Sequence, residues 1–340
     1  LWGERGHGIV RRGKLSLLFR AALAYPLLVW RFLTAPRPEI VLVPYPGHFD
    51  MPLLALLCRI RGTPVVFDAF VSLYDTVISD RKLADPGSLL ARLTKLVDRL
   101  ACRTADLVLT DTPQHVHYLS ETTGVPVDRF RVVWVGAEEE IFHPRPQIEP
   151  DPALVLFYGT FIPLHGMETI VRAAAALEGE GIRFRIIGDG QERPVVDRLQ
   201  EDLAVRNIER VDWVPLERLP EEIAGAGVCL GIFGTTGKAD RVVPNKVYQC
   251  VATGRPVVTG DTRAIREAFE EGEVVTVPVG DPGALAEAIR QLRRDPRRRE
   301  EVAARGRRRF LRDYDDASLA SLLRNHLTEV RDGLPGRPSR

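Results

Sequence analysis

Short hydrophobic runs rich in β-branched residues alternate with longer amphipathic stretches in the first part of the chain. The runs have the length and composition of buried strands and cover residues 39–43, 64–68, 106–110 and 131–135. Apolar residues at helical spacing fall between them, at about 51–61 and 88–104. Strands that alternate with helices in this way are typical of βαβ units with parallel strands. The first part of the chain therefore predicts a parallel-sheet domain.

A second series of the same kind follows. Its expected strands are residues 153–158, 183–187, 210–213, 228–232, 256–258 and 274–277. Its expected helices are residues 167–179, 192–204, 219–224, 246–253, 265–271 and 282–294. The whole pattern predicts an α/β protein in which two Rossmann-like βαβ domains face each other across a cleft. A ligand is expected in that cleft, at the carboxyl ends of the strands.

A proline-rich stretch at residues 143–152 separates the two series, because proline neither continues a helix nor pairs in a central strand. The expected boundaries are a first domain at 1–145, a linker at 146–152, a second domain at 153–315, a last helix at 316–332 and a tail at 333–340. The first series has fewer strands than such a domain normally contains, and the chain starts at Leu1 rather than at methionine. We therefore expect that an amino-terminal βα unit is missing.

Composition narrows the classes of function. The 47 basic residues nearly balance 46 acidic ones, so the formal charge of +1 gives no broad attraction for nucleic acid. The arginine-rich stretch 290–312 also carries acidic residues and apolar residues at helical spacing (Val302, Phe310, Leu311), which predicts solvated helix faces. The four cysteines are far apart and predict buried thiols in a reducing, cytoplasmic compartment; they are Cys58, Cys102, Cys229 and Cys250.

Residues 15–33 are rich in apolar side chains but are interrupted by Arg20, Pro26 and Arg31. No apolar run reaches the roughly 18 residues that a transmembrane helix needs. One interpretation is a helix that faces the core. The other is a peripheral contact of residues 11–33 with an anionic membrane surface, at the inner face of the membrane, through Trp30 and neighbouring arginines. The sequence leaves both open.

Two glycine-rich turns follow expected strands of the second domain. The turn from Tyr158 to Gly166 leads into a helix, and its small residues let a phosphate approach the helix amino terminus. The turn Gly188-Asp189-Gly190 is a weak signal alone, because many α/β proteins contain one. Further on, Pro244 is placed to start a helix whose first-turn N–H groups would face the cleft. Lys246 on that helix would add a positive charge for a pyrophosphate, or it is a surface lysine.

Polar residues also follow strands of the first domain. Asp50 is explained as a helix N-cap, which leaves His48 as the residue to contact an acceptor. Asp68 ends the expected second strand and Asp75 follows it; these carboxylates would hold sugar hydroxyls or cap a turn. The histidines show no zinc-ligand spacing with cysteines or carboxylates, so no metal is expected.

The order of these motifs resembles that of the group 1 (family 4) glycosyltransferases of the GT-B fold. The matching segments are residues 159–166, 188–190, 207–215, 249–258 and, more weakly, 133–138 followed by 142–144. The resemblance covers roughly residues 39–330. It implies the retaining, metal-independent transfer of a sugar from a nucleotide-sugar donor, and a last helix that returns to the first domain.

The chain departs from the family at the donor site. The family's Glu-x7-Glu signature falls on Arg241 and Gln249. Gln249 can still hydrogen-bond ribose hydroxyls, as a donor and acceptor rather than as an anion. The family's phosphate-binding Arg and Lys fall on Thr160 and His165, and we expect Lys246 to compensate, because a related subset of the family carries a Pro-x-Lys element. The family's donor-sugar histidine falls near Phe70.

The sequence therefore predicts a glycosyltransferase that uses a nucleotide sugar such as a UDP- or GDP-sugar, with a saccharide or lipid-linked acceptor, in cell-surface polysaccharide or glycolipid synthesis. The expected catalytic residues are Lys246, Asp68 and His48. The expected donor-binding residues are Gly159, Thr160, His165, Gly166, Gly188, Gly190, Val214, Pro215, Asp240, Arg241, Pro244, Asn245, Lys246 and Gln249. The alternatives are a nucleotide-sugar-binding protein without turnover and, third, a nucleotide-sugar epimerase. The base, the sugar and the acceptor do not follow from the sequence.

Overall fold

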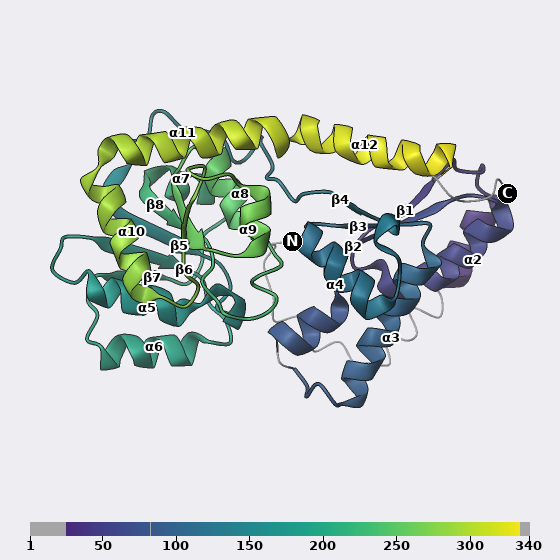
Figure 1. The fold of residues 1–340 in the computed structure, drawn as a ribbon, viewed down its shortest axis with the longest axis horizontal. Coiled ribbons are helices and arrows are strands. Elements are labelled where there is room, and N and C mark those ends of the chain that lie inside the picture. The colour runs from purple at the N-terminus through teal and green to yellow at the C-terminus, as the bar shows by residue number, and fades with distance from the viewer. Residues whose placement is uncertain (1–24, 82, 334–340) are drawn as a thin grey trace.

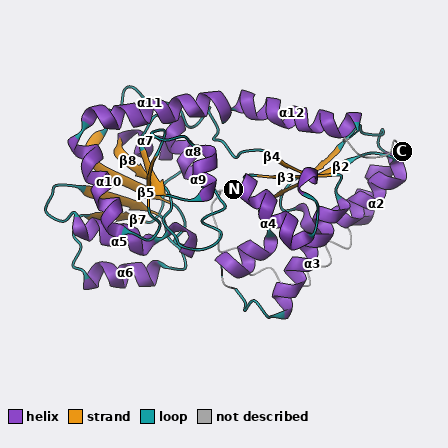
Figure 2. Cartoon of the chain, viewed as in Figure 1, coloured by secondary structure: helices purple, strands orange, loops and turns teal. Residues whose placement is uncertain are grey.

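A computed structural model describes residues 25–81 and 83–333 (Figure 1). It contains two α/β domains, each built on its own parallel sheet (Figure 2). Membrane contact was predicted for residues 11–33, of which residues 11–24 lie outside the described residues. Residues 25–34 are helical, and Trp30 on this helix is exposed. Within the described residues, no helix is both long enough and apolar enough to cross a membrane.

The first domain has a four-stranded parallel sheet in the order β1-β2-β3-β4. The strands are β1 (Val41–Val43), β2 (Val65–Phe70), β3 (Leu107–Thr110) and β4 (Phe130–Val132). The helices that connect them are α2 (Met51–Arg61), α3 (Leu89–Thr104) and α4 (Pro113–Thr123), with a π-helical turn at Asp75–Asp80. Two of these helices have side-chain caps: Ser88 accepts from the N–H of Ala91, and Thr112 from that of His115.

The second domain has a six-stranded parallel sheet in the order β10-β9-β8-β5-β6-β7. The strands are β5 (Asp151–Tyr158), β6 (Arg183–Ile187), β7 (Ile208–Val211), β8 (Ala226–Leu230), β9 (Val257–Gly260) and β10 (Val275–Val277). The helices are α5 (Met167–Ala176), α6 (Arg193–Asp202), α7 (Leu219–Gly225), α8 (Asn245–Ala252), α9 (Arg263–Ala268), α10 (Pro282–Arg294) and α11 (Pro296–Asp313). This strand order reverses between β5 and β8, which places a ligand-binding switch point at their carboxyl ends.

The last helix, α12 (Asp316–Asp332), continues beyond α11 and lies along the first domain (Figure 1). Val330 packs with Val66, Leu107 and Leu109 of the first sheet. His326 Nε2 donates to the Val132 carbonyl at 3.2 Å, and Arg131 pairs with Glu329 at 3.0 Å. The chain thus crosses between the domains twice, once before β5 and once through α12.

The strands and helices predicted from the hydrophobic pattern are confirmed with shifts of a few residues. One prediction is wrong: the proline-rich stretch was expected to end before the strand, yet β5 begins at Asp151 and includes Pro152 in a central strand. The register to β8 shifts between Asp151 and Val155, so the proline lies in an irregular part of the ladder where its missing N–H costs no regular hydrogen bond.

The predicted N-cap role of Asp50 is also wrong. Asp50 stands before α2, but its side chain makes no cap bond and accepts from the Tyr25 hydroxyl at 2.7 Å. In α11, Val302 and Phe310 are buried and Leu311 is exposed. The four cysteines are buried and free, as predicted.

Candidate functional site

The two glycine-rich turns of the second domain contact each other through the backbone. The Gly159 N–H donates to the Ile187 carbonyl at 2.9 Å, and the Phe161 N–H donates to the Asp189 carbonyl at 3.0 Å. A Cβ at Gly188, where φ is +131°, would lie 2.1 Å from the Gly159 oxygen. A Cβ at Gly190 would lie 2.5 Å from the Phe161 nitrogen. Only glycine permits this approach at the ends of β5 and β6.

The turn after β5 also contacts the loop after β8. These contacts join the two strands' loops at the switch point. The Phe233 N–H donates to the His165 carbonyl at 3.1 Å, and the Gly234 N–H donates to the Leu164 carbonyl at 3.2 Å. Gly166 has φ +64° at the start of α5, where a Cβ would lie 2.5 Å from the Phe233 carbonyl carbon. The loops from β5, β6 and β8 therefore form one fixed backbone surface.

The ammonium group of Lys246 lies against this surface. Helix α8 begins at Asn245, with Pro244 in an extended conformation at the N-cap. The Lys246 side chain is buried, and its Nζ lies 4.0 Å from the centre of the Phe157 ring. A Cβ at Gly159 would lie 3.0 Å from this Nζ. Among the described residues, Nζ has no hydrogen-bond partner, and burial lowers the pKa of Lys246 to about 7.

His165 lies beside Lys246 and is held in one tautomer. Its Nδ1 donates to the Thr160 carbonyl, because a carbonyl oxygen can only accept. Burial lowers the pKa of His165 well below its usual value, and the positive charge of Lys246 lowers it further. Arg81 of the first domain and Lys238 act in the same direction. His165 is therefore a neutral imidazole with Nε2 as an acceptor, in a field made positive by both domains.

Gln249 lies one turn after Lys246 on α8 and is fixed by β5. The Tyr158 hydroxyl donates to Gln249 Oε1 at 2.8 Å. The amide NH₂ of Gln249 keeps its capacity to donate. Phe157 contacts Lys246, and Tyr158 contacts Gln249. The sequence analysis missed the role of this aromatic pair. Its signal was present, since both residues end the strand directly before Gly159.

Two predicted donor-binding residues are engaged elsewhere. Arg241 Nη2 lies 2.7 Å from both carboxylate oxygens of Asp75, which belongs to the first domain and is fully buried. The guanidinium of Arg241 also stacks 4.2 Å from the centre of the Tyr118 ring. Asp240 pairs with Arg263 at 2.6 Å, at the start of α9. Arg241, which stands at the position of the first signature glutamate, therefore joins the two domains. Thr112 of the first domain adds a second contact, because its Oγ1 donates to the Arg241 carbonyl at 2.6 Å.

Replacing Asp75 and Arg241 in a double-mutant cycle tests this contact. We expect a coupling free energy of about 2 kcal/mol between Asp75→Asn and Arg241→Met, because each single change leaves a buried partner uncompensated. Chemical denaturation of the four proteins measures it. The exposed i,i+4 pair Glu168 and Arg172 serves as a matched control, with an expected coupling below about 0.5 kcal/mol. Equal couplings in the two cycles would contradict the assignment.

The two predicted catalytic residues of the first domain, His48 and Asp68, differ in their surroundings. His48 is buried; its Nε2 lies 3.5 Å from Asp98 Oδ1, and burial lowers the pKa of His48. The expected contact of His48 with an acceptor is not supported by this placement. Asp68 lies within β2, two residues before the strand ends at Phe70, and is half-buried. Burial raises the pKa of Asp68 to about 6, with a further contribution from Asp111. Asp68 therefore stays partly exposed near the carboxyl end of β2.

Asp98 and Asp111 were not singled out in the sequence analysis. Asp98 of α3 accepts from the Ser72 hydroxyl and from the N–H groups of Leu73 and Tyr74. Asp111 pairs with the fully buried His115. Nothing local marks Asp98, because its partners lie more than 20 residues away in the chain.

At the far edge of the second sheet, Val214 packs on the core and Pro215 follows it, after β7. Their expected role in donor binding stays a prediction.

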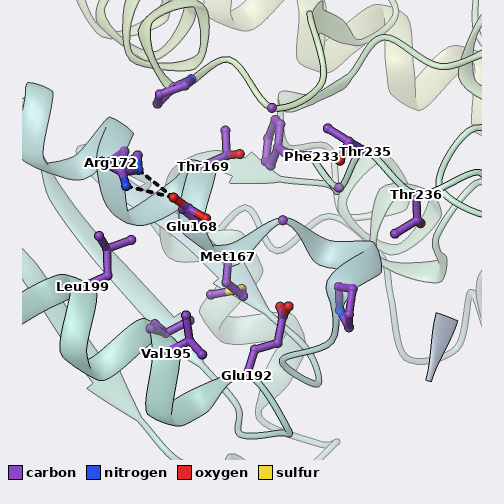
Figure 3. Close-up of a pocket in the computed structure, with 16 residues that line it drawn as sticks. Met167, Glu168, Thr169, Arg172, Glu192, Val195, Leu199, Phe233, Thr235 and Thr236 are labelled. Carbon is purple, nitrogen blue, oxygen red and sulfur yellow. Dashed lines mark hydrogen bonds and ion pairs between the residues drawn. The ribbon is translucent and has the colours of Figure 1, made fainter. Parts of the chain in front are cut away.

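A cavity of about 450 Å³ lies next to the switch point (Figure 3). It is lined by the starts of α5 and α6 and by the loops at 233–236 and 280–282. Glu168 and Arg172 pair across its edge. Gly166 and Phe233 belong to both the cavity and the closed turn, whereas Gly159, His165 and Lys246 do not line the cavity. It is therefore a neighbouring space rather than the Lys246 site itself.

Comparison with known proteins agrees with this geometry. A family model described as a glycosyl transferase 4-like domain matches residues 2–136, and one described as glycosyl transferase-like matches residues 167–323. The chain is 27% identical over 227 residues to a D-inositol 3-phosphate glycosyltransferase of Thermomonospora curvata, which covers 59% of the chain and 52% of that relative. It is 23% identical over 292 residues to the putative colanic acid biosynthesis glycosyl transferase WcaI of Escherichia coli, which covers 80% and 70%.

Among solved structures, HepE of Anabaena in complex with UDP superposes with a TM-score of 0.72 at 15% identity, over 89% of this chain and 82% of that one. This likeness shows the fold, which is GT-B. The chain spans about half the length of the T. curvata relative. From the two matched domains and the named relatives, the chain belongs to the group 1, family 4 type of glycosyltransferases.

Proposed function

We propose that this protein transfers a sugar from a nucleotide-sugar donor to an acceptor hydroxyl, and that the donor diphosphate binds beside Lys246. The observation that carries the proposal is the Lys246 ammonium, which is buried at the switch point without a partner among the described residues. An unpaired buried amine is costly in free energy, and a bound phosphate would remove that cost. The positive charges that act on this site, from Lys246, Arg81 and Lys238, favour an anionic ligand.

The chemistry follows from where negative charge develops. Breaking the bond between the sugar and the donor leaves charge on the departing nucleoside diphosphate, and Lys246 with the first-turn N–H groups of α8 would stabilise it. We propose that the charge of Lys246 stabilises the departing nucleoside diphosphate without a metal ion. We also propose that the sugar keeps its anomeric configuration, as the family resemblance implies. The UDP bound to the structural neighbour supports a nucleoside diphosphate as the ligand.

The first domain supplies the acceptor side. Asp68, with its pKa raised to about 6, is the carboxyl group there that we propose to hold or deprotonate a hydroxyl. The name of the colanic acid relative supports a saccharide acceptor in cell-surface polysaccharide or glycolipid synthesis. We propose that the reaction takes place in the cytoplasm.

A donor panel tests the proposal. The chain is incubated with UDP-, GDP-, ADP- and TDP-sugars, and the release of free nucleoside diphosphate is measured together with the sugar product. Release above the blank from one donor supports a transferase that hydrolyses its donor slowly without acceptor. Binding of a donor without release indicates a binding protein, and a changed sugar still attached to the nucleotide indicates an epimerase. Either of these two results overturns the proposal.

Donor affinity should depend on pH near neutrality. In the free protein Lys246 has a pKa of about 7, so roughly half of the molecules carry the charge at neutral pH. A bound diphosphate favours the charged form, so binding takes up a proton above pH 7 and the affinity falls as the pH rises. Calorimetric titrations in two buffers with different ionisation enthalpies measure this uptake. A binding enthalpy that does not change with the buffer would contradict the assignment to Lys246.

A further inference from the structure

Helix α3 presents its leucines to solvent instead of to the core. Leu89, Leu93, Leu96 and Leu100 follow helical spacing along one face, and between 44% and 82% of each side chain is exposed. We call these four residues the leucine face. In an ordinary surface helix the apolar stripe packs inward and the polar residues face water. The leucine face is therefore an apolar surface that the described part of the protein leaves uncovered.

The opposite side of α3 is buried, so the helix is not loosely attached. Its buried residues are small or polar: Ala91, Thr94, Asp98, Ala101 and Cys102. Asp98 accepts three hydrogen bonds from the loop at residues 72–74, which fixes the rotation of the helix about its axis. A rotation that buried the leucines would place the carboxylate of Asp98 in water and break these bonds. The outward position of the leucines is thus enforced by specific contacts.

Positive side chains flank the leucine face. Arg92, Lys95, Arg99 and Arg103 are exposed, and Asp98 is the sole acidic residue of α3 and is buried. Among the described residues, none of the four cations forms an ion pair with a carboxylate. A chain with a formal charge of only +1 therefore concentrates unbalanced positive charge on one helix.

The neighbouring helix extends this surface. Helix α2 packs against α3 and exposes Leu56 and Ile60, and it carries Arg59 and Arg61 with no acidic residue. Both helices belong to the first domain, and α2 lies at its end away from the second domain (Figure 1). Exposed apolar groups flanked by cations match the two components of an anionic bilayer, its acyl region and its charged headgroups.

Charge also decides between the possible occupants. Residues 1–24 of this chain contain five basic residues and one acidic residue, so they carry the same sign as α3 and would be repelled by it. A second copy of the chain docked through the same face would place like cations against each other. We propose that the leucine face of α3 docks the protein on an anionic lipid bilayer. This goes beyond the proposed function and does not depend on it.

Docking through α3 would connect the bilayer to the domain junction. The loop that Asp98 holds at residues 72–74 leads directly into Asp75, the partner of Arg241. One side of α3 would thus face lipid while the other positions the residues that join the two domains.

Vesicle sedimentation tests the proposal. The full chain is mixed with phosphatidylcholine vesicles with and without phosphatidylglycerol. We expect binding only with phosphatidylglycerol, weakened by salt, and a loss of about tenfold or more in partitioning for the double variant Leu93→Glu/Leu96→Glu. Because these side chains are exposed, the variant should fold. The matched control is Leu203→Glu/Leu311→Glu, which changes two exposed leucines of the second domain and should bind like the unaltered chain.

A labelled variant decides whether another occupant covers the face. The described cysteines are buried, so Leu93→Cys can be labelled selectively with an environment-sensitive fluorophore. We expect the emission of a water-exposed probe in solution and a blue shift when anionic vesicles are added. An apolar signal before vesicles are added, a dimer that the Leu93→Glu/Leu96→Glu variant dissociates, or equal vesicle binding by that variant and the control pair would each overturn the proposal.

Discussion

Lys246→Met is expected to weaken the binding of the nucleoside diphosphate by about a hundredfold, close to 3 kcal/mol. Methionine has nearly the same length and fills the space above the Phe157 ring, but it carries no charge and donates no hydrogen bond. The backbone surface formed by the turns at Gly159 and Gly188 is left intact. The loss therefore measures the charge of Lys246 rather than a change of shape. Isothermal titration of the preferred nucleoside diphosphate gives both affinities.

A matched control separates this site effect from a change in net charge. Arg308→Met removes one positive charge from an exposed position of α11 and should leave the affinity unchanged. If Lys246→Met binds the ligand as tightly as Arg308→Met does, the diphosphate does not contact Lys246. The donor site would then have to be sought elsewhere, for example in the cavity between α5 and α6.

The same substitution should stabilise the unliganded protein, and by an amount that depends on pH. Lys246 has a pKa of about 7 in the folded chain, below its value of 10.5 when exposed. Between these values the unfolded state binds more protons, so the free energy of unfolding rises with pH. The penalty is fully present below about pH 7, where it is on the order of 5 kcal/mol, and it disappears above about pH 10.5. Lys246→Met removes the penalty.

Chemical denaturation of both proteins at about pH 6.5 and about pH 9.5 measures the difference. The stabilisation by methionine should be large at the lower pH and should shrink at the higher one. Lys238→Met is the control, because Lys238 is also buried but donates to Thr76 Oγ1 at 3.3 Å. Its replacement should destabilise the protein. A gain from Lys246→Met that stays the same at both pH values would show that the amine is not held uncharged by burial.

The sequence predicted the secondary structure of both domains because the strands are continuous hydrophobic runs and the helices are amphipathic. Side-chain caps such as Thr112 and Asp281 and left-handed glycines such as Gly254 mark the helix ends. Pro152 was misplaced, since a local rule for proline does not foresee a register shift that depends on the neighbouring strand. Helix α3 was likewise predicted from its local pattern alone, with no prediction of which side faces solvent. Its spacing shows an apolar face, but not which way that face points.

The candidate site was predictable where it depends on the backbone. Glycines that follow strands and a lysine after a proline at a helix start are local patterns, and the structure brings Gly159, His165 and Lys246 together. Contacts between the domains were not predictable. Arg241 was expected to bind the donor, but its side chain pairs with Asp75, 166 residues away in the chain. His48 followed a strand as expected, yet the aromatic rings of Tyr45 and Phe67 bury it.

The protonation of Lys246 itself tests the central claim most directly. The chain contains only five lysines, so isotope labelling of lysine side chains gives a simple NMR spectrum in which Lys246→Met identifies one signal. We expect that signal to titrate near pH 7 in the free protein and to titrate at a higher pH once the nucleoside diphosphate is bound. A signal that titrates like the exposed lysines, or one that does not respond to any nucleoside diphosphate, would contradict a donor site at Lys246.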